Sequence, residues 1–317
     1  MSVVNDTKFK FAMFMLTGIP GLEDVYIWIS ISFCIMYVIS IVGNSAILFI
    51  IKTDPSLHEP MYIFLSMLAV TDLALSISTI PTILSLFLFN VREISLNACF
   101  AQLFFICLFQ CIESSVLLLM AFDSFTAICK PLRYASILTL ARIAKMGLAC
   151  VLRGVAVIFP LPILLKRFRY CQANVLSHSY CLHQEVMKMA CSDITDNSIY
   201  VNRLYGLVIV VLVIGLDLTL IALSYGLIIR AVLRISSKKA HQKTLNTCTA
   251  HIFVMLTSYT PFLVSSLTHR FSQGFAPHVH IILANLHLLV PPMLNPIIYG
   301  VKTKELSDKM FKYACRM

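Results

Sequence analysis

Long hydrophobic stretches dominate the chain, and short polar segments separate them. A helix needs about 20 predominantly apolar residues to cross the hydrocarbon core of a bilayer. Seven stretches reach that length: Tyr26–Ile51, Met61–Phe89, Ala98–Cys129, Ala144–Leu165, Ile199–Leu233, Leu245–Thr268 and Val279–Val301. Each stretch predicts one membrane-crossing helix. Together they predict an all-α membrane protein, a seven-transmembrane helix bundle.

The composition supports lipid as the solvent of this bundle. The chain has 317 residues, of which 59% are hydrophobic and 13% charged, and its mean hydropathy is +0.85. Soluble domains are roughly half apolar and about a quarter charged. The length accommodates a single membrane domain over 1–317. After the last stretch, Leu306, Met310 and Phe311 recur among lysines, which predicts a short amphipathic C-terminal helix on the membrane.

Lysines and arginines are distributed unevenly between the two sets of loops. Fifteen lie on one side and nine on the other, and Arg153 lies inside the fourth stretch. Because cytoplasmic loops carry the excess, residues 1–25 are predicted to be extracellular, 26–301 to form the bundle and 302–317 to form a cytoplasmic tail. This asymmetry explains the net charge of +10 without a nucleic-acid partner. A glycosylation sequon at Asn5 lies on the predicted outer side.

Four cysteines also lie on the predicted outer side, where oxidising conditions permit disulfides. They are Cys99, Cys171, Cys181 and Cys191. Four cysteines allow three pairings, and spacing alone does not choose among them.

Three acidic residues lie deep inside hydrophobic stretches: Asp72, Glu113 and Asp217. Each costs roughly 2.5 to 3.5 kcal/mol on insertion scales, so each is expected to face the bundle interior and to find a partner. Such acids either hold an exchangeable ion or proton, or form a hydrogen-bonded packing network. The rarity of acids inside a membrane favours the first interpretation for Asp72 and Glu113, whereas Asp217 fits both equally.

Several sequence strings occur in a characteristic order. They are Gly43-Asn44, LHEPMYIFLSMLAVTDL (57–73), MAFDSFTAICKPLRY (120–134), LSYGLIIRAVLRI (223–235), KAHQKTLNTCTAHI (239–252) and PMLNPIIYGVKTKEL (292–306). Together they resemble the rhodopsin-like G-protein-coupled receptors and, among these, the olfactory receptors. The outer segment HRFSQGFAPHVHI and Asp217 resemble the class I, fish-like branch. The resemblance extends over essentially the whole chain.

The resemblance implies a plasma-membrane sensory receptor that binds an odorant and activates a stimulatory, olfactory-type G protein and cAMP signalling. It implies disulfides between Cys99 and Cys181 and between Cys171 and Cys191. It also places Asp72, Glu113, Asn44 and Asn295 around one mid-membrane cavity. Two neighbouring carboxylates do not readily ionise together, so a Na⁺ ion or a proton is expected between them, and no other cofactor or metal.

The inner ends of the helices contain the expected activation switch. Asn295-Pro296 loosens the seventh helix, which lets Tyr299 move toward the third helix and Tyr225. The related receptors normally carry an arginine after Asp123, and this chain has Ser124. The serine either weakens the resting state or removes a G-protein contact, and we favour the second outcome. The alternative function is therefore an odorant-binding receptor that couples weakly or does not signal.

By family position the ligand pocket lies in the outer halves of helices three, five, six and seven. Candidate residues share helix faces by their spacing of three or four. They are Leu103, Cys107, Gln110, Tyr259, Phe262, Ser266 and Arg270. Arg270 either extends to water or holds a carboxylate, and the second interpretation predicts a short or medium-chain carboxylic acid as ligand, with Ser266 as a supporting donor.

Other protein classes fit less well. Intramembrane acids also occur in channels and transporters, but the sequence has no internal repeat of the transporter kind. No HExxH, GxSxG or phosphate-binding glycine loop occurs, so an enzyme is not expected. The basic inner loops are expected to contact membrane lipid or to frame the G-protein cleft.

Overall fold

The computed structural model describes residues 13–19, 21, 25–168, 170, 175–190, 197–233, 248–261, 263–264 and 277–314. The elements in chain order are β1 (Met13–Leu16), α1 (Tyr26–Thr53), η2 (Pro55–Leu57), α2 (Pro60–Phe89), β2 (Glu93–Ser95), α3 (Leu96–Cys129), η3 (Pro131–Arg133), α4 (Tyr134–Ile137), α5 (Leu140–Ile158), α6 (Pro160–Lys166), β3 (Val175–Leu176), α7 (His183–Lys188), α8 (Asn197–Val210), η4 (Val211–Gly215), α9 (Leu216–Val232), α11 (Pro277–Lys302) and α12 (Lys304–Ala314). Residues 248–261 are also helical.

The predicted seven-transmembrane bundle is confirmed. Six helical spans among the described residues are long and apolar enough to cross a membrane. Two of them combine consecutive elements, α5 with α6 and α8 with α9. The helix of residues 248–261 lies within the sixth predicted stretch, whose remaining residues lie mostly outside the described ones. The fifth span contains a π-helical turn, η4, of the kind that is frequent near functional sites.

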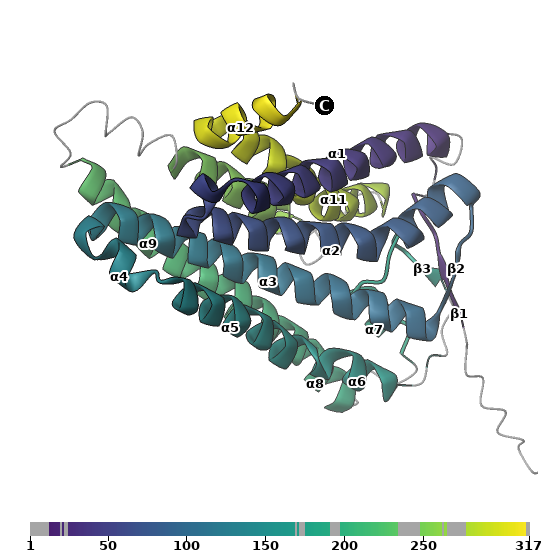
Figure 1. Ribbon diagram of the computed structural model, residues 1–317. Helices are drawn as coiled ribbons and strands as arrows, with labels where there is room; N and C mark the ends of the chain where they lie inside the picture. The colour runs from purple at the N-terminus through teal and green to yellow at the C-terminus, as the bar shows by residue number, and fades with distance from the viewer. Residues whose placement is uncertain are drawn as a thin grey trace, which may run out of the picture.

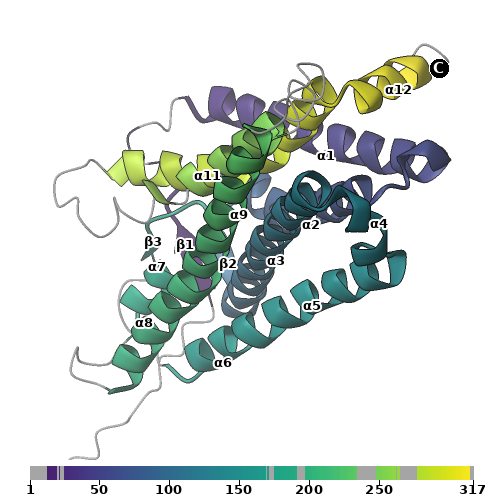
Figure 2. The same cartoon turned by 90° about the vertical axis from the view of Figure 1, so that its left-hand side faces the viewer.

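Helix α3 lies at the centre of the bundle. It contacts α2 on one side and α5, α6 and α9 on the other, and Figures 1 and 2 show it running between them. Many of its polar residues are buried, including Glu113, Ser114 and Ser115. This central position lets one helix contribute to sites at both ends of the bundle.

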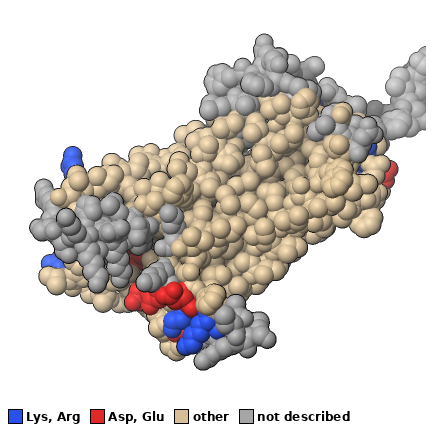
Figure 3. Space-filling view, turned by 90° about the horizontal axis from the view of Figure 1, so that it is seen from above, with Lys and Arg blue, Asp and Glu red and all other residues tan. Residues whose placement is uncertain are grey.

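The outward surface of the spans is apolar. Trp28 on α1 is 72% exposed and Leu233 just beyond α9 is 75% exposed. Figure 3 shows a broad face made almost wholly of uncharged residues, with charged side chains near its margins. Such a face requires lipid contact, because soluble proteins rarely expose large apolar patches. The protein is therefore a multi-pass membrane protein.

A small sheet at one end of the bundle was not predicted from the sequence. Its strand order is β2-β1-β3, with β1 antiparallel to β2 and parallel to β3. Phe14 and Leu16 are buried, whereas Met13 and Met15 are exposed, as the alternation of a strand requires. The sheet fastens the described part of the N-terminal segment over the end of the bundle (Figure 1).

The C-terminal amphipathic helix is confirmed as α12. Leu306 is fully buried against the bundle and Phe311 is 73% exposed. Two polar contacts hold α12 against the loop and helix that follow α1. Tyr62 Oη donates to Glu305 Oε2 over 3.0 Å, and Lys309 pairs with Asp54. These contacts fix α12 across the inner end of the bundle.

Candidate functional site

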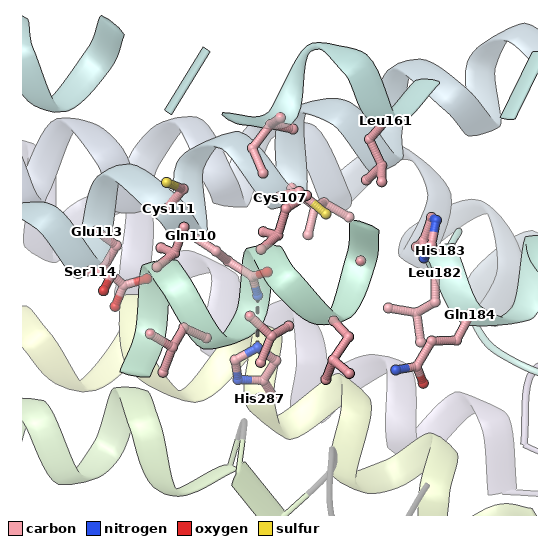
Figure 4. A pocket seen from close by; sticks show the side chains of 18 of the residues that line it. Cys107, Gln110, Cys111, Glu113, Ser114, Leu161, Leu182, His183, Gln184 and His287 are labelled. Atoms are coloured by element: carbon pink, nitrogen blue, oxygen red, sulfur yellow. Dashed lines mark hydrogen bonds between the residues drawn. The ribbon is translucent and has the colours of Figure 1, made fainter. Parts of the chain in front are cut away.

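A cavity of about 560 Å³ lies among α3, α6, α7, α8, α11 and the helix of residues 248–261. Ligand pockets for small molecules occupy roughly 300 to 1,000 Å³. Figure 4 shows its two ends: Leu182, His183 and Gln184 lie at one, and Glu113 and Ser114 at the other. Leu182, His183 and Gln184 lie in and just before α7, close to the disulfide, so we call theirs the outer end and the opposite end the floor.

The predicted pocket residues are only partly brought together. Cys107, Gln110 and Tyr259 line the cavity. Leu103 is 1% exposed and packs in the hydrophobic cluster of the outer half. Along α3 the cavity wall begins about one turn further inward, at Ile106. Phe262, Ser266 and Arg270 lie outside the described residues.

Polar contacts cross the cavity between helices. Gln110 Nε2 and His287 Nε2 are 2.7 Å apart, which connects α3 with α11. Ser258 Oγ donates to Glu113 Oε1 over 2.8 Å, which connects the helix of residues 248–261 with α3. His287 and Ser258 belong to no short sequence motif, so the sequence alone does not identify them as cavity residues.

A charged pair lies just beneath the cavity. Arg153 Nη1 lies 2.8 Å from Asp217 Oδ1, and the Asp217 side chain is fully buried. Ser114 Oγ donates to Asp217 Oδ2 over 2.7 Å. Tyr259 Oη lies 2.8 Å from Ser114 Oγ. The Ser114 hydroxyl has a single hydrogen, which it donates to Asp217. Tyr259 must therefore donate the hydrogen bond to Ser114.

This network joins four spans of the bundle. It connects α5, α9, α3 and the helix of residues 248–261 through Arg153, Asp217, Ser114 and Tyr259. The expectation that Asp217 finds a partner inside the bundle agrees with this geometry. The partner is Arg153, the one lysine or arginine that the sequence places in neither set of loops.

Of the four residues of the predicted ion site, only Asp72 and Asn295 are hydrogen-bonded to each other among the described residues. Asn295 Nδ2 donates to Asp72 Oδ2 over 2.9 Å, whereas Asn44 Nδ2 donates to the carbonyl oxygens of Ser40 and Pro292. Glu113 accepts a hydrogen bond from Ser258. Buried oxygens Asp72 Oδ1 and Asn295 Oδ1 have no hydrogen-bond partner among the described residues.

These atoms fit a proton or a hard cation better than a transition metal. Carboxylate and amide oxygens are suitable ligands for hard cations. No group of three or more His, Cys, Asp or Glu residues within the described part of the chain has the geometry of a metal site.

The inner end of α3 contains a hydrogen bond at Asp123 that the sequence did not predict. Tyr134 Oη on α4 donates to Asp123 Oδ1 over 2.8 Å. Burial, and then the neighbouring Asp123 carboxylate, raise the pKa of the Tyr134 hydroxyl, so it remains a proton donor. Ser124 is buried, at 6% exposure. Tyr134, from the segment after α3, thus forms a hydrogen bond with the Asp123 carboxylate. Asp123 directly precedes Ser124, the position where related receptors carry arginine.

The two predicted switch tyrosines are both buried near this end. Tyr299 Oη points toward Met120 Sδ of α3, 4.0 Å away, and its ring packs edge-on to His251 at 5.8 Å between centroids. The Tyr225 hydroxyl is buried without a hydrogen-bond partner among the described residues. Tyr299 therefore already contacts helix α3 in this conformation.

The predicted disulfide between Cys99 and Cys181 is present, with 5.5 Å between the Cα atoms. It joins the start of α3 to the segment between β3 and α7. Cys171, Cys191 and Asn5 lie outside the described residues, so the second disulfide and the glycosylation site remain predictions.

Comparisons with known proteins agree with this architecture. The model of the family described as olfactory receptor matches residues 33–316. Human olfactory receptor 51G2 is 55% identical, with 99% of this chain and 98% of that protein aligned. Human olfactory receptor 51A4 is 52% identical, with 100% and 99% aligned.

A solved structure shows the same fold. Squid rhodopsin superposes with a TM-score of 0.71 at 18% sequence identity, over 93% of this chain and 86% of that one. The family indicates a signalling receptor, with a small-molecule ligand and a G-protein partner, and not an enzyme. The chain belongs to the olfactory receptor family of G-protein-coupled receptors.

Proposed function

We propose that the protein is an odorant receptor of the plasma membrane, with its N-terminus outside, that activates an olfactory-type stimulatory G protein and raises cAMP. The observation that carries this proposal is the cavity of about 560 Å³, whose floor includes Ser258 and Tyr259. These two residues belong to the helix of residues 248–261 and bond to Glu113 and Ser114 of α3. A ligand that competes for these contacts changes how the two helices pack.

The proposed ligand is a short or medium-chain carboxylic acid. The wall between the two ends of the cavity is largely aliphatic, with Ile106, Leu161 and Val210 among its residues, and such a wall suits a hydrocarbon chain. Arg270 and Ser266 are proposed to hold the carboxylate. Acids, alcohols and aldehydes of matched chain length should be compared in a cAMP assay at equal surface expression. Undiminished acid responses in Arg270→Ala would contradict the assignment of Arg270.

A receptor that binds odorant but couples weakly is the second candidate. It is favoured by Ser124, which cannot supply the charge that arginine supplies in related receptors, and by the contact of Asp123 with Tyr134. Ser124→Arg is expected to increase agonist-driven cAMP. An unchanged or lower response at equal surface expression would show that Ser124 does not limit coupling.

A Na⁺ ion or a proton is proposed to occupy the space beside Asp72 and Asn295. The two buried oxygens without a partner among the described residues support this proposal. Thermal stability of the purified receptor should rise in NaCl relative to choline chloride if Na⁺ binds, and Asp72→Asn should abolish that difference. If the protein and the variant are equally insensitive to Na⁺, a proton remains as the only proposed occupant.

A further inference from the structure

The outer end of the cavity has a charged wall built by two elements. Gln184 and Lys188 lie four residues apart on α7, and both line the cavity. Arg203 lines it from α8, on the same helix as Gly206, Leu207 and Val210. Residues three, four and seven positions apart share a helix face. The cation of Arg203 thus lies at the outer end of an otherwise apolar strip of α8.

Close packing between α7 and α8 holds the helix backbone on both sides of the exposed Arg203. His183 Nε2 lies 2.7 Å from Asn202 Oδ1. A Cβ atom on Gly206 would lie 3.0 Å from the His183 ring, so α7 lies directly against α8 at this glycine. The residues on either side of this contact therefore form one rigid wall of the cavity.

The two cationic side chains Lys188 and Arg203, which both line the cavity, differ in their ion pairing. Lys188 Nζ pairs with Glu185 Oε1 at 2.5 Å, and the Glu185 side chain is buried. Burial lowers the pKa of His183, which keeps the ring neutral near pH 7. Within the described part of the chain, Arg203 has no carboxylate at ion-pair distance. A guanidinium in this setting is suited to bind an oxyanion through two parallel hydrogen bonds.

We propose that Arg203 determines the selectivity of the receptor for acids by pairing with the ligand carboxylate at the outer end of the cavity. The hydrocarbon chain then extends inward along Leu207 and Val210, toward the polar floor. This inference rests on the proposed acid specificity and adds a residue to it. The same guanidinium chemistry also suits the phosphate of an outer-leaflet lipid, and the experiment separates the two sources.

The test measures binding directly, so that it does not depend on coupling through Ser124. The thermal stability of purified receptor is measured against concentration of a medium-chain fatty acid and of the alcohol with the same chain length. A ligand that binds only the folded state stabilises it in proportion to the logarithm of its concentration over Kd. The variants are Arg203→Gln and Arg203→Lys, with Arg167→Gln as the control. The Arg167 side chain is exposed, and the described lining of the cavity does not include it.

Arg203→Gln is expected to weaken acid binding at least about tenfold and to leave alcohol binding unchanged. Arg203→Lys should retain part of the acid affinity, and Arg167→Gln should retain all of it. Equal acid affinity in Arg203→Gln and the unaltered receptor would overturn the inference. So would an equal loss for acid and alcohol, which would indicate a lipid contact or a structural role.

Failure of the proposed function has a different result. If the unaltered receptor binds the alcohol but no acid of the series, the acid specificity itself is wrong, and the role of Arg203 is wrong with it. If the unaltered receptor binds acids and the Arg203→Gln variant binds them equally, only the role of Arg203 is wrong.

Discussion

The ion pair between Arg153 and Asp217 is expected to stabilise the folded receptor, and its contribution can be measured by mutation. Replacing Arg153 with methionine keeps a long, flexible side chain but removes the charge. Asp217, whose side chain is fully buried, would then keep the hydrogen bond that Ser114 donates and lose the 2.8 Å contact with the guanidinium. Removing one partner of a buried ion pair costs about 3 to 5 kcal/mol, because the other charge remains buried.

The structure places the expected loss at the lower end of that range. Ser114 continues to donate a hydrogen bond to the carboxylate after Arg153 is replaced, which offsets part of the loss. We therefore expect a loss of about 3 kcal/mol for Arg153→Met. This corresponds to a decrease of roughly 6 to 12 °C in the melting temperature of the purified receptor.

The double variant Arg153→Met with Asp217→Asn separates the charge pair from simple packing. It removes both charges and retains an amide that Ser114 can contact, so it should be more stable than Arg153→Met alone. The difference from additivity should be about 2 kcal/mol, within the range seen for residues in one network. If the double variant is as unstable as the sum of the single variants, the two side chains are not coupled and the reasoning is refuted.

Two further predictions concern helix packing and the inner surface. Gly43→Val should destabilise the receptor by about 1 to 3 kcal/mol, because its Cβ would lie 2.8 Å from the Pro296 ring; Gly226→Val, with nothing within 4 Å, is the thermal-stability control. Lys309, with Ser56, lowers the pKa of Asp54 from 3.8 to about 2. The stabilisation by this carboxylate is therefore present above pH 4 and lost as pH falls toward 2, and Lys309→Ala should flatten that part of a stability-against-pH curve.

The bundle was predictable because a bilayer leaves few alternatives. Within hydrocarbon each backbone group must be satisfied locally, so an apolar stretch of sufficient length becomes a helix. The small sheet lacked such a constraint. Strand β1 has four residues, and its partners lie at Glu93–Ser95 and Val175–Leu176, far along the chain. Such a short alternation of exposed and buried residues predicts a strand only when its distant pairing partners are known.

The site was predictable to a smaller extent, for a related reason. Helical spacing correctly grouped Cys107 with Gln110 on one face of α3, but it did not show where the cavity ends, so Leu103 was included. That limit depends on α7 and the disulfide segment, which cover the outer half. Arg153 and Asp217 are 64 positions apart, and no local pattern connects them.

The proposed ligand pocket and the proposed coupling site lie on different parts of α3. The hydrogen bonds at the cavity involve Gln110, Glu113 and Ser114. The coupling end involves Asp123 and Ser124, more than two helical turns further along. Among the residues that the structure describes, no hydrogen bond at the cavity includes Ser124. If the proposed roles are right, we therefore expect Ser124 to change coupling without removing the residues of the proposed pocket, so that a receptor with no cAMP response would still bind its ligand.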